Sequence, residues 1–210
     1  MKGENTMGRI MKKQITRYCP LIAGGIFLLT AAGLITAALH SDLKGENVCQ
    51  AFLSWAIGVS RGRSELYFAV TVVMTALLGI RLFKTEMHRI KKFLYVLILL
   101  CFFVMGFCPL NIVSSVHPSI VFGIHIGAEL TYFGLAAVIS LLSAIFAKTK
   151  AQRIIGLLPV FYAAILLLIP ESLRECAGIW ELLFIMQPIL ILQTEQCGGS
   201  VNKIQPAAAS

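Results

Sequence analysis

The chain has 210 residues, of which 58% are apolar and only 13% are charged, and its mean hydropathy is +0.83. A soluble domain carries roughly 25% charged residues, so this chain could not cover a water-facing surface without exposing large apolar patches. A soluble enzyme is therefore excluded, and so is a disordered chain, which needs low hydrophobicity. The net charge of +8 does not indicate a nucleic-acid partner, because the positive residues lie between apolar runs.

Apolar segments of membrane-spanning length recur along the chain. A bilayer core about 30 Å thick requires about 20 largely apolar helical residues. Six segments meet or approach this length: 20–39, 66–82, 93–108, 119–146, 154–169 and 179–192. The third, fifth and sixth are short, but flanking polar residues can reach the interface. We predict an all-α integral membrane bundle of six transmembrane helices.

The predicted bundle forms one domain over residues 20–192, between a basic cytoplasmic N-terminus (1–19) and a disordered cytoplasmic tail (193–210). The first segment has an apolar core of about 19 residues, which exceeds that of a secretory signal, so we expect a retained helix. A seventh apolar stretch, 48–60, is too short to span and is interpreted as an interfacial or re-entrant part of the first loop.

Positive residues are distributed unevenly among the predicted loops. Six spans would place the two termini and the second and fourth loops on one side. Fourteen lysines and arginines fall there: Lys2, Arg9, Lys12, Lys13, Arg17, Arg81, Lys84, Arg89, Lys91, Lys92, Lys148, Lys150, Arg153 and Lys203. Four fall on the other side: Lys44, Arg61, Arg63 and Arg174. The positive-inside rule predicts cytoplasmic termini in the plasma (inner) membrane, and this topological role explains each basic residue.

The fourth segment carries the most polar residues. On a helix, His125, Glu129, Tyr132 and Ser143 fall within about 60° of one another, whereas three glycines (Gly123, Gly127 and Gly134) lie on nearly the opposite face. The small face would let a neighbouring helix approach closely. A helix with two such faces is expected to be central in the bundle.

Ionisable residues inside membrane segments are the best indicators of function, because hydrocarbon makes them costly. A candidate polar cavity on the non-cytoplasmic side is lined by His40, Glu65, His117, His125, Glu129, Tyr132 and Glu181. We interpret His125 and Glu129 as a buried hydrogen-bonded pair. The alternative is a metal site of His117, His125 and Glu129, with His40 or Glu181 as a further ligand; no HExxH string supports it.

Prolines and cysteines add smaller signals. Pro159 and Pro188 lie inside the fifth and sixth segments, where neighbours or waters can satisfy the freed carbonyl. We interpret both as packing kinks, and a hinge or cavity is the alternative. Cys49, Cys108 and Cys176 are expected at the outer face, where an oxidising compartment would allow one disulfide among them. The spacing does not select a pair.

Three passages together resemble the bacterial domain-of-unknown-function family 998 and, more loosely, the DRAM/Frag-like clan of six-span membrane proteins. They are LSWAIGVSRGRSELYFAVTVVMTALLGI (53–80), MGFCPLN (105–111) and HPSIVFGIHIGAELTYFG (117–134). The positions that match are Ser54, Gly58, Gly106, Pro109, His117 and His125. The family's usual Gly-Phe-Pro exit here reads Gly-Phe-Cys-Pro. The resemblance implies a six-helix membrane protein with no established activity in its bacterial branch. The eukaryotic relatives are linked with trafficking, autophagy and lipid organisation.

We therefore expect a non-enzymatic membrane protein whose partners are the lipid bilayer and a membrane protein or a second copy, with no nucleic acid. Two alternatives remain open. One is a metal-dependent intramembrane lipid hydrolase, in which the ion would activate water. The other is a small proton-coupled transporter that uses Glu129 and His125 as a relay.

Overall fold

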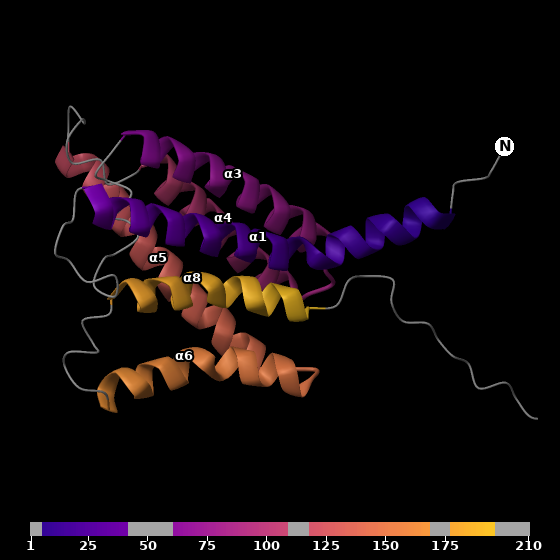
Figure 1. Cartoon of the computed structure of the whole chain (residues 1–210). Helices are drawn as coiled ribbons and strands as arrows, with labels where there is room; N and C mark the ends of the chain where they lie inside the picture. Colours follow the sequence, from indigo (N-terminus) through magenta and orange to yellow (C-terminus); the bar gives the residue numbers. More distant parts are fainter. Residues whose placement is uncertain (1–5, 42–60, 109–117, 169–176, 196–210) are drawn as a thin grey trace, which may run out of the picture.

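A computed structural model describes residues 6–41, 61–108, 118–168 and 177–195. The described part is all-α, as predicted, and each of the six apolar segments lies within or largely within a helix (Figure 1). The helices are α1 (Thr6–Ser41), α3 (Arg61–Lys84), α4 (Arg89–Phe107), α5 (Pro118–Ile145), α6 (Lys150–Leu168) and α8 (Ala177–Thr194). The stretch 48–60 lies outside the described residues.

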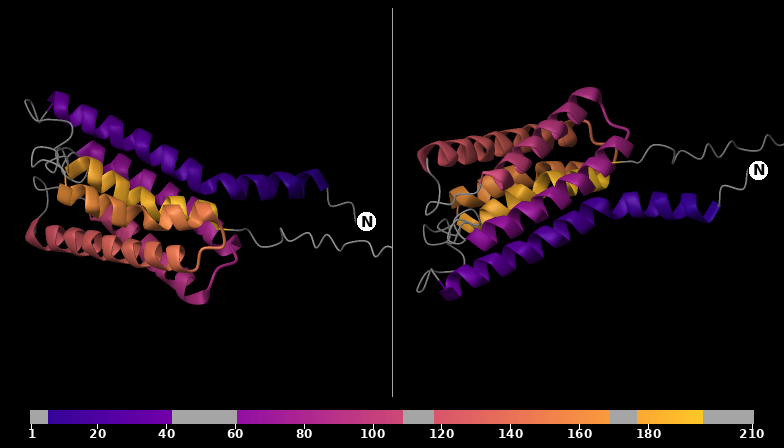
Figure 2. Two further views of the ribbon diagram at one scale, coloured as in Figure 1. Left: turned by 90° about the horizontal axis from the view of Figure 1, so that it is seen from below. Right: turned by 90° about the horizontal axis from the view of Figure 1, so that it is seen from above.

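Four helices are long and apolar enough to cross a membrane. These spans are Gln14–His40, Gly62–Lys84, Arg89–Phe107 and Ile120–Ile145, and Ile179–Thr194 of α8 forms a shorter apolar helix. α1 begins well before Pro20, the predicted start of the first span, and its N-terminal part projects beyond the other helices (Figure 2). The predicted boundary at residue 19 therefore falls inside a continuous helix.

The turn between α5 and α6 is fixed by a capping box. The Thr149 hydroxyl accepts a hydrogen bond from the Gln152 backbone N–H at 3.2 Å. In return, the Gln152 amide oxygen accepts from the backbone N–H groups of Lys148 and Thr149. These reciprocal bonds satisfy donors that the first turn of a helix leaves without partners, so α6 starts at a defined residue.

Each helix contacts the next one in the chain, from α1 through α3, α4, α5 and α6 to α8, and α8 contacts α1 as well. α8 also contacts α5 and α3. Of the α8 side chains that are described, only Ile179 is exposed. The expectation that the fourth segment is central is therefore wrong: the sixth, α8, takes that position. Its apolar residues are spread all round the helix, which is typical of a fully buried helix.

Glycines mark the closest helix contacts, but on different helices from those predicted. A Cβ added to Gly156 of α6 would lie 2.6 Å from the backbone nitrogen of Ala144 in α5. A Cβ on Gly106 of α4 would lie 2.8 Å from the side chain of Thr71 in α3. The glycines of α5 behave differently, because Gly123, Gly127 and Gly134 have nothing within 4 Å of an added Cβ. The small face of α5 contacts no described helix.

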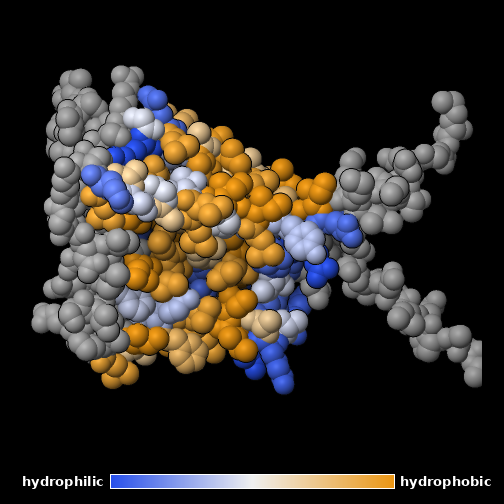
Figure 3. All heavy atoms as spheres, viewed as in Figure 1, coloured by the Kyte–Doolittle hydropathy of each residue, from blue (hydrophilic) through white to orange (hydrophobic). Residues whose placement is uncertain are grey.

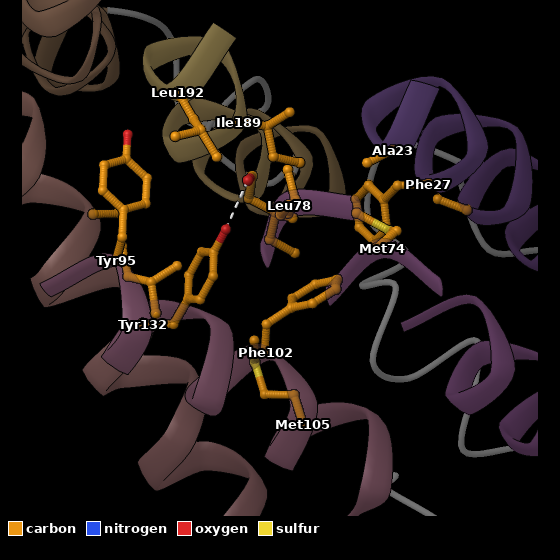
Figure 4. Close-up of a cluster of buried hydrophobic side chains, with 14 of the residues drawn as sticks. Ala23, Phe27, Met74, Leu78, Tyr95, Phe102, Met105, Tyr132, Ile189 and Leu192 are labelled. Atoms are coloured by element: carbon orange, nitrogen blue, oxygen red, sulfur yellow. Dashed lines mark hydrogen bonds between the residues drawn. The ribbon is translucent and has the colours of Figure 1, made fainter. Parts of the chain in front are cut away.

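The core lies between α1, α3, α4, α5 and α8 (Figure 4). Phe102 of α4 meets Phe27 of α1 edge-on at 5.9 Å between ring centroids and Tyr132 of α5 at 6.1 Å. A cavity of about 10 Å³ remains beside these rings, which is about the room that one water molecule needs. The interior is thus closely filled, and its polar side chains bond either within their own helix, as Thr71 and Ser140 do, or to a neighbouring helix.

Candidate functional site

Two tyrosines of neighbouring helices fix α8 in the bundle. The Tyr132 hydroxyl of α5 donates to the carbonyl oxygen of Ile185 at 2.7 Å, which Figure 4 marks with a dashed line. The Tyr95 hydroxyl of α4 donates to the carbonyl oxygen of Pro188 at 3.1 Å. α5 and α8 run in the same direction along the bundle (Figure 1). The bond from Tyr132 therefore sets the register between them.

This register places two carboxylates at the same level. Glu129 lies about one turn before Tyr132 in α5, and Glu181 lies about one turn before Ile185 in α8. Both carboxylates interact electrostatically with the hydroxyl of Tyr67 in α3. Tyr67 is buried, Glu181 is only 8% exposed and Glu129 is partly buried. Three helices thus bring Glu129, Glu181 and Tyr67 into one region, which we call the carboxylate site.

The chemistry of the carboxylate site follows from its surroundings. A carboxyl group held away from water is favoured in its uncharged, protonated form. A buried tyrosine hydroxyl can donate a hydrogen bond to a carboxylate or accept one from a protonated carboxyl group. Glu129, which is partly buried, is therefore the group of this site that is suited to holding a proton.

The imidazole of His125 is not part of the carboxylate site. Its Nδ1 lies 2.7 Å from the carbonyl oxygen of Cys108, the residue that caps the C-terminal end of α4. No hydrogen bond joins His125 to Glu129 within the described residues, so the predicted pair is not formed. Because a carbonyl oxygen only accepts, Nδ1 carries the hydrogen. The buried imidazole thereby ties α5 to the end of α4.

The remaining predicted site residues are less closely connected. His40 is exposed, and its Nδ1 lies 3.0 Å from the carbonyl oxygen of Thr36 in its own helix. Glu65 is exposed near the start of α3. His117 lies outside the described residues, as do Cys49 and Cys176, while Cys108 forms no disulfide with another described cysteine. Across residues 6–41, 61–108, 118–168 and 177–195, no group of three His, Cys, Asp or Glu residues could hold a metal ion.

Gln187 was not among the predicted site residues, although its side chain is fully buried. Its Nε2 donates to the carbonyl oxygen of Ile155 in α6 at 2.5 Å. Pro159, four residues after Ile155, has no N–H to offer that oxygen. A side chain of a neighbouring helix thus satisfies the carbonyl that Pro159 frees. A glutamine beside Pro188 in an apolar segment was the available signal.

A second cluster, which we call the C-terminal clamp, holds the last turn of α8. It consists of Arg81, Lys91, Gln152 and Glu195. Arg81 is 2% exposed and donates to the carbonyl oxygens of Leu192 and Gln193, each at 3.4 Å, and to that of Glu195. Lys91 forms an ion pair with the Glu195 carboxylate, and Gln152 donates to the Thr194 carbonyl at 3.2 Å.

The C-terminal clamp satisfies carbonyl groups that the end of a helix leaves without partners. The interpretation of every basic residue as a topology signal alone is therefore too narrow, since Arg81 also holds α8 in place. Other basic side chains near this end, including Lys84, Arg89, Lys148 and Arg153, are exposed. The clamp thus lies among the basic residues of the loops that precede α4 and α6.

The chain matches no family model and no curated protein, and no solved structure matches it. The resemblance to family 998 therefore stays a prediction.

Proposed function

We propose that this chain is a six-span integral membrane protein of the plasma (inner) membrane that binds lipid or a membrane partner without catalysing a reaction. The observation that carries the proposal is that the outward faces of the helices are apolar. Large apolar side chains are exposed on each of the four long helices, for example Leu29, Phe83, Phe93 and Leu130. Apolar surface crosses the middle of the face shown in Figure 3, with hydrophilic residues nearer the ends. Hydrocarbon would solvate such a surface favourably.

The distribution of basic residues supports cytoplasmic termini. Four segments lie at the same end of the bundle (Figure 1): the start of α1, the α3–α4 turn, the α5–α6 turn and the end of α8. Arg17, Lys84, Arg89, Lys150 and Arg153 are exposed toward that end. Positive residues flanking membrane helices remain preferentially in the cytoplasm, so this end is the cytoplasmic one in our proposal.

The use of the interior polar groups supports binding rather than catalysis. Three interior side chains donate to a backbone carbonyl inside another helix: Tyr95, Tyr132 and Gln187. His125 bonds to the carbonyl of Cys108, which caps α4. All four bonds hold the helices of the bundle together. The open glycine face of α5 supports the partner part of the proposal, because small residues let a second membrane helix approach closely.

The proposal is tested with the full chain reconstituted in phospholipid vesicles. We expect the protein to float with the vesicles, to retain phospholipid after purification in mild detergent, and to leave the lipid intact in the presence of divalent metal ions. Lipid breakdown that depends on the protein and on a metal ion would contradict the proposal and favour the hydrolase alternative, with His117, His125 and Glu129 as the candidate ligands.

The carboxylate site favours one second candidate, a proton-coupled transporter. Glu129 and Glu181 lie on different helices and share one neighbour, Tyr67, which would allow proton uptake to change how α5 and α8 pack. If this candidate is correct, vesicles should show protein-dependent proton flux that is lost in Glu129→Gln and kept in Glu86→Gln, a change at an exposed residue. Equal flux from both variants would remove Glu129 as the relay.

A further inference from the structure

Most of the side chains described in the C-terminal half of α6 are exposed. Among the side chains described between residues 160 and 168, Tyr162 alone is partly buried. Its neighbours on the N-terminal side, Val160 and Phe161, are 60% and 56% exposed, and Leu168 at the end is 84% exposed. A helix buried on one side covers positions that lie three or four residues apart. Of the side chains described in this half of α6, those at 160, 161, 163, 164, 165 and 168 are all exposed.

The contacts of Tyr162 are aromatic and involve α8. Its ring centroid lies 6.4 Å from that of Trp180 and 6.1 Å from that of Phe184, which it meets nearly edge-on. Phe184 in turn lies 5.7 Å from Phe133 of α5. These ring contacts are weak individually, at about 0.5–1.5 kcal/mol beyond area burial, and Tyr162 is the one partly buried side chain among those described in this half.

The N-terminal half of α6 is fixed by three independent contacts. Gly156 lies against the α5 backbone, Gln187 bonds to the Ile155 carbonyl, and Gln152 bonds to the Thr194 carbonyl. Pro159 separates this half from the loosely held one and removes the backbone bond that would stiffen the junction. Pro159 therefore separates a half of α6 held by three described contacts from a half in which Tyr162 is the one partly buried side chain described.

The Trp180 ring of α8 lies beside Tyr162 in the C-terminal half of α6. Its indole Nε1 is buried and has no hydrogen-bond partner among the described residues. An unpaired N–H away from water costs free energy, and indole N–H groups near the ends of membrane helices commonly face the lipid interface. The indole can only donate, so the missing partner is an acceptor.

We infer that residues 160–168 form a hinged flap that opens toward the lipid and admits a phospholipid between α6 and α8, with the Trp180 N–H donating to an ester carbonyl oxygen of the lipid. This inference rests on the proposed membrane location and specifies the lipid that the protein binds. Tyr162 is the closing contact and Pro159 the hinge.

The test uses the fluorescence of Trp180 in the full chain. The chain has two tryptophans, so Trp55→Phe leaves Trp180 as the only one. In vesicles of phosphatidylcholine with brominated acyl chains, Tyr162→Ala should increase quenching of Trp180 about twofold by populating the open flap. Phe161→Ala, at the exposed neighbouring position, should leave quenching unchanged, and Pro159→Ala should lower it. Equal quenching in Tyr162→Ala and Phe161→Ala would overturn the inference.

A second measurement does not depend on opening the flap by mutation. Trp180→Phe keeps an aromatic ring and removes the donor, so the purified protein should retain less phosphatidylcholine than wild type, as counted by mass spectrometry. Retention equal to wild type would overturn the role of the N–H. Flotation separates the two proposals: a chain that does not float with vesicles contradicts the membrane location itself, whereas a floating chain with unresponsive quenching contradicts only the flap.

Discussion

Gln187 of α8 donates its side-chain hydrogen bond to the carbonyl oxygen of Ile155 in α6, the oxygen that Pro159 leaves without its helical partner. The buried amide of Gln187 and the unpaired carbonyl of Ile155 thus satisfy each other across the interface between α6 and α8. Gln187 would be costly in an apolar helix without an acceptor, and the Ile155 carbonyl would be costly without a donor.

This compensation predicts a coupled pair of substitutions. Gln187→Leu should destabilise the protein by about 1–2 kcal/mol, because the Ile155 carbonyl loses its donor. In a Pro159→Ala background, the introduced alanine supplies the missing backbone N–H, so the same change should cost less. Unfolding of all four proteins in mixed detergent micelles measures the coupling. Equal costs of Gln187→Leu in the two backgrounds would contradict this account.

The bond from Tyr132 to Ile185 predicts a measurable loss in Tyr132→Phe. The variant keeps the ring but removes the donor, which should cost about 1 kcal/mol and lower the melting temperature in detergent. Tyr18→Phe is the matched control, because Tyr18 is 49% exposed and should melt as the wild type does. If both variants melt together below the wild type, the interhelical bond is not the cause.

The C-terminal clamp predicts that Arg81 is needed for stability as well as topology. Arg81→Gln removes a charged donor from three carbonyl groups at the end of α8, and a loss of roughly 2–3 kcal/mol is expected for hydrogen bonds to a charged group. Arg89→Gln removes the same charge from an exposed position and should have little effect on unfolding. A matching loss in Arg89→Gln would show that charge alone, rather than the clamp, determines stability.

The glycines of α5 and α6 predict opposite responses to the same change. Gly156→Ala would place a Cβ against the α5 backbone, so it should separate the helices and cost about 1–3 kcal/mol. Gly127→Ala meets open space and should be neutral or slightly stabilising, because alanine favours helix by up to about 1 kcal/mol. Urea unfolding in micelles compares them. A destabilised Gly127→Ala would show that the α5 face is occupied.

The helices could be predicted from the sequence because long apolar runs are a local signal. The position of each helix in the bundle could not. α5 carries a polar face and a small face, which suggested a central position, whereas α8 shows little segregation of polar and apolar residues and is the covered helix. A pattern without a preferred face is easily overlooked, although it is typical of a helix surrounded on all sides.

The partners of buried polar residues were the least predictable feature. His125 and Glu129 are neighbours along one helix, so their spacing suggested a pair, yet the His125 ring bonds to Cys108 at the end of α4. Arg81 looked like one of many loop cations, and only the three-dimensional structure shows that it lies against the end of α8. Such pairings join residues far apart in the chain, and local spacing carries no information about them.

The most direct test is protease access to tags on the two ends of the full chain in sealed inside-out vesicles. If hydrocarbon surrounds six helices and the basic end faces the cytoplasm, both tags should be cleaved, and both should be protected in right-side-out vesicles. Cleavage of one tag in each kind of vesicle would contradict the even number of spans on which the proposed architecture depends.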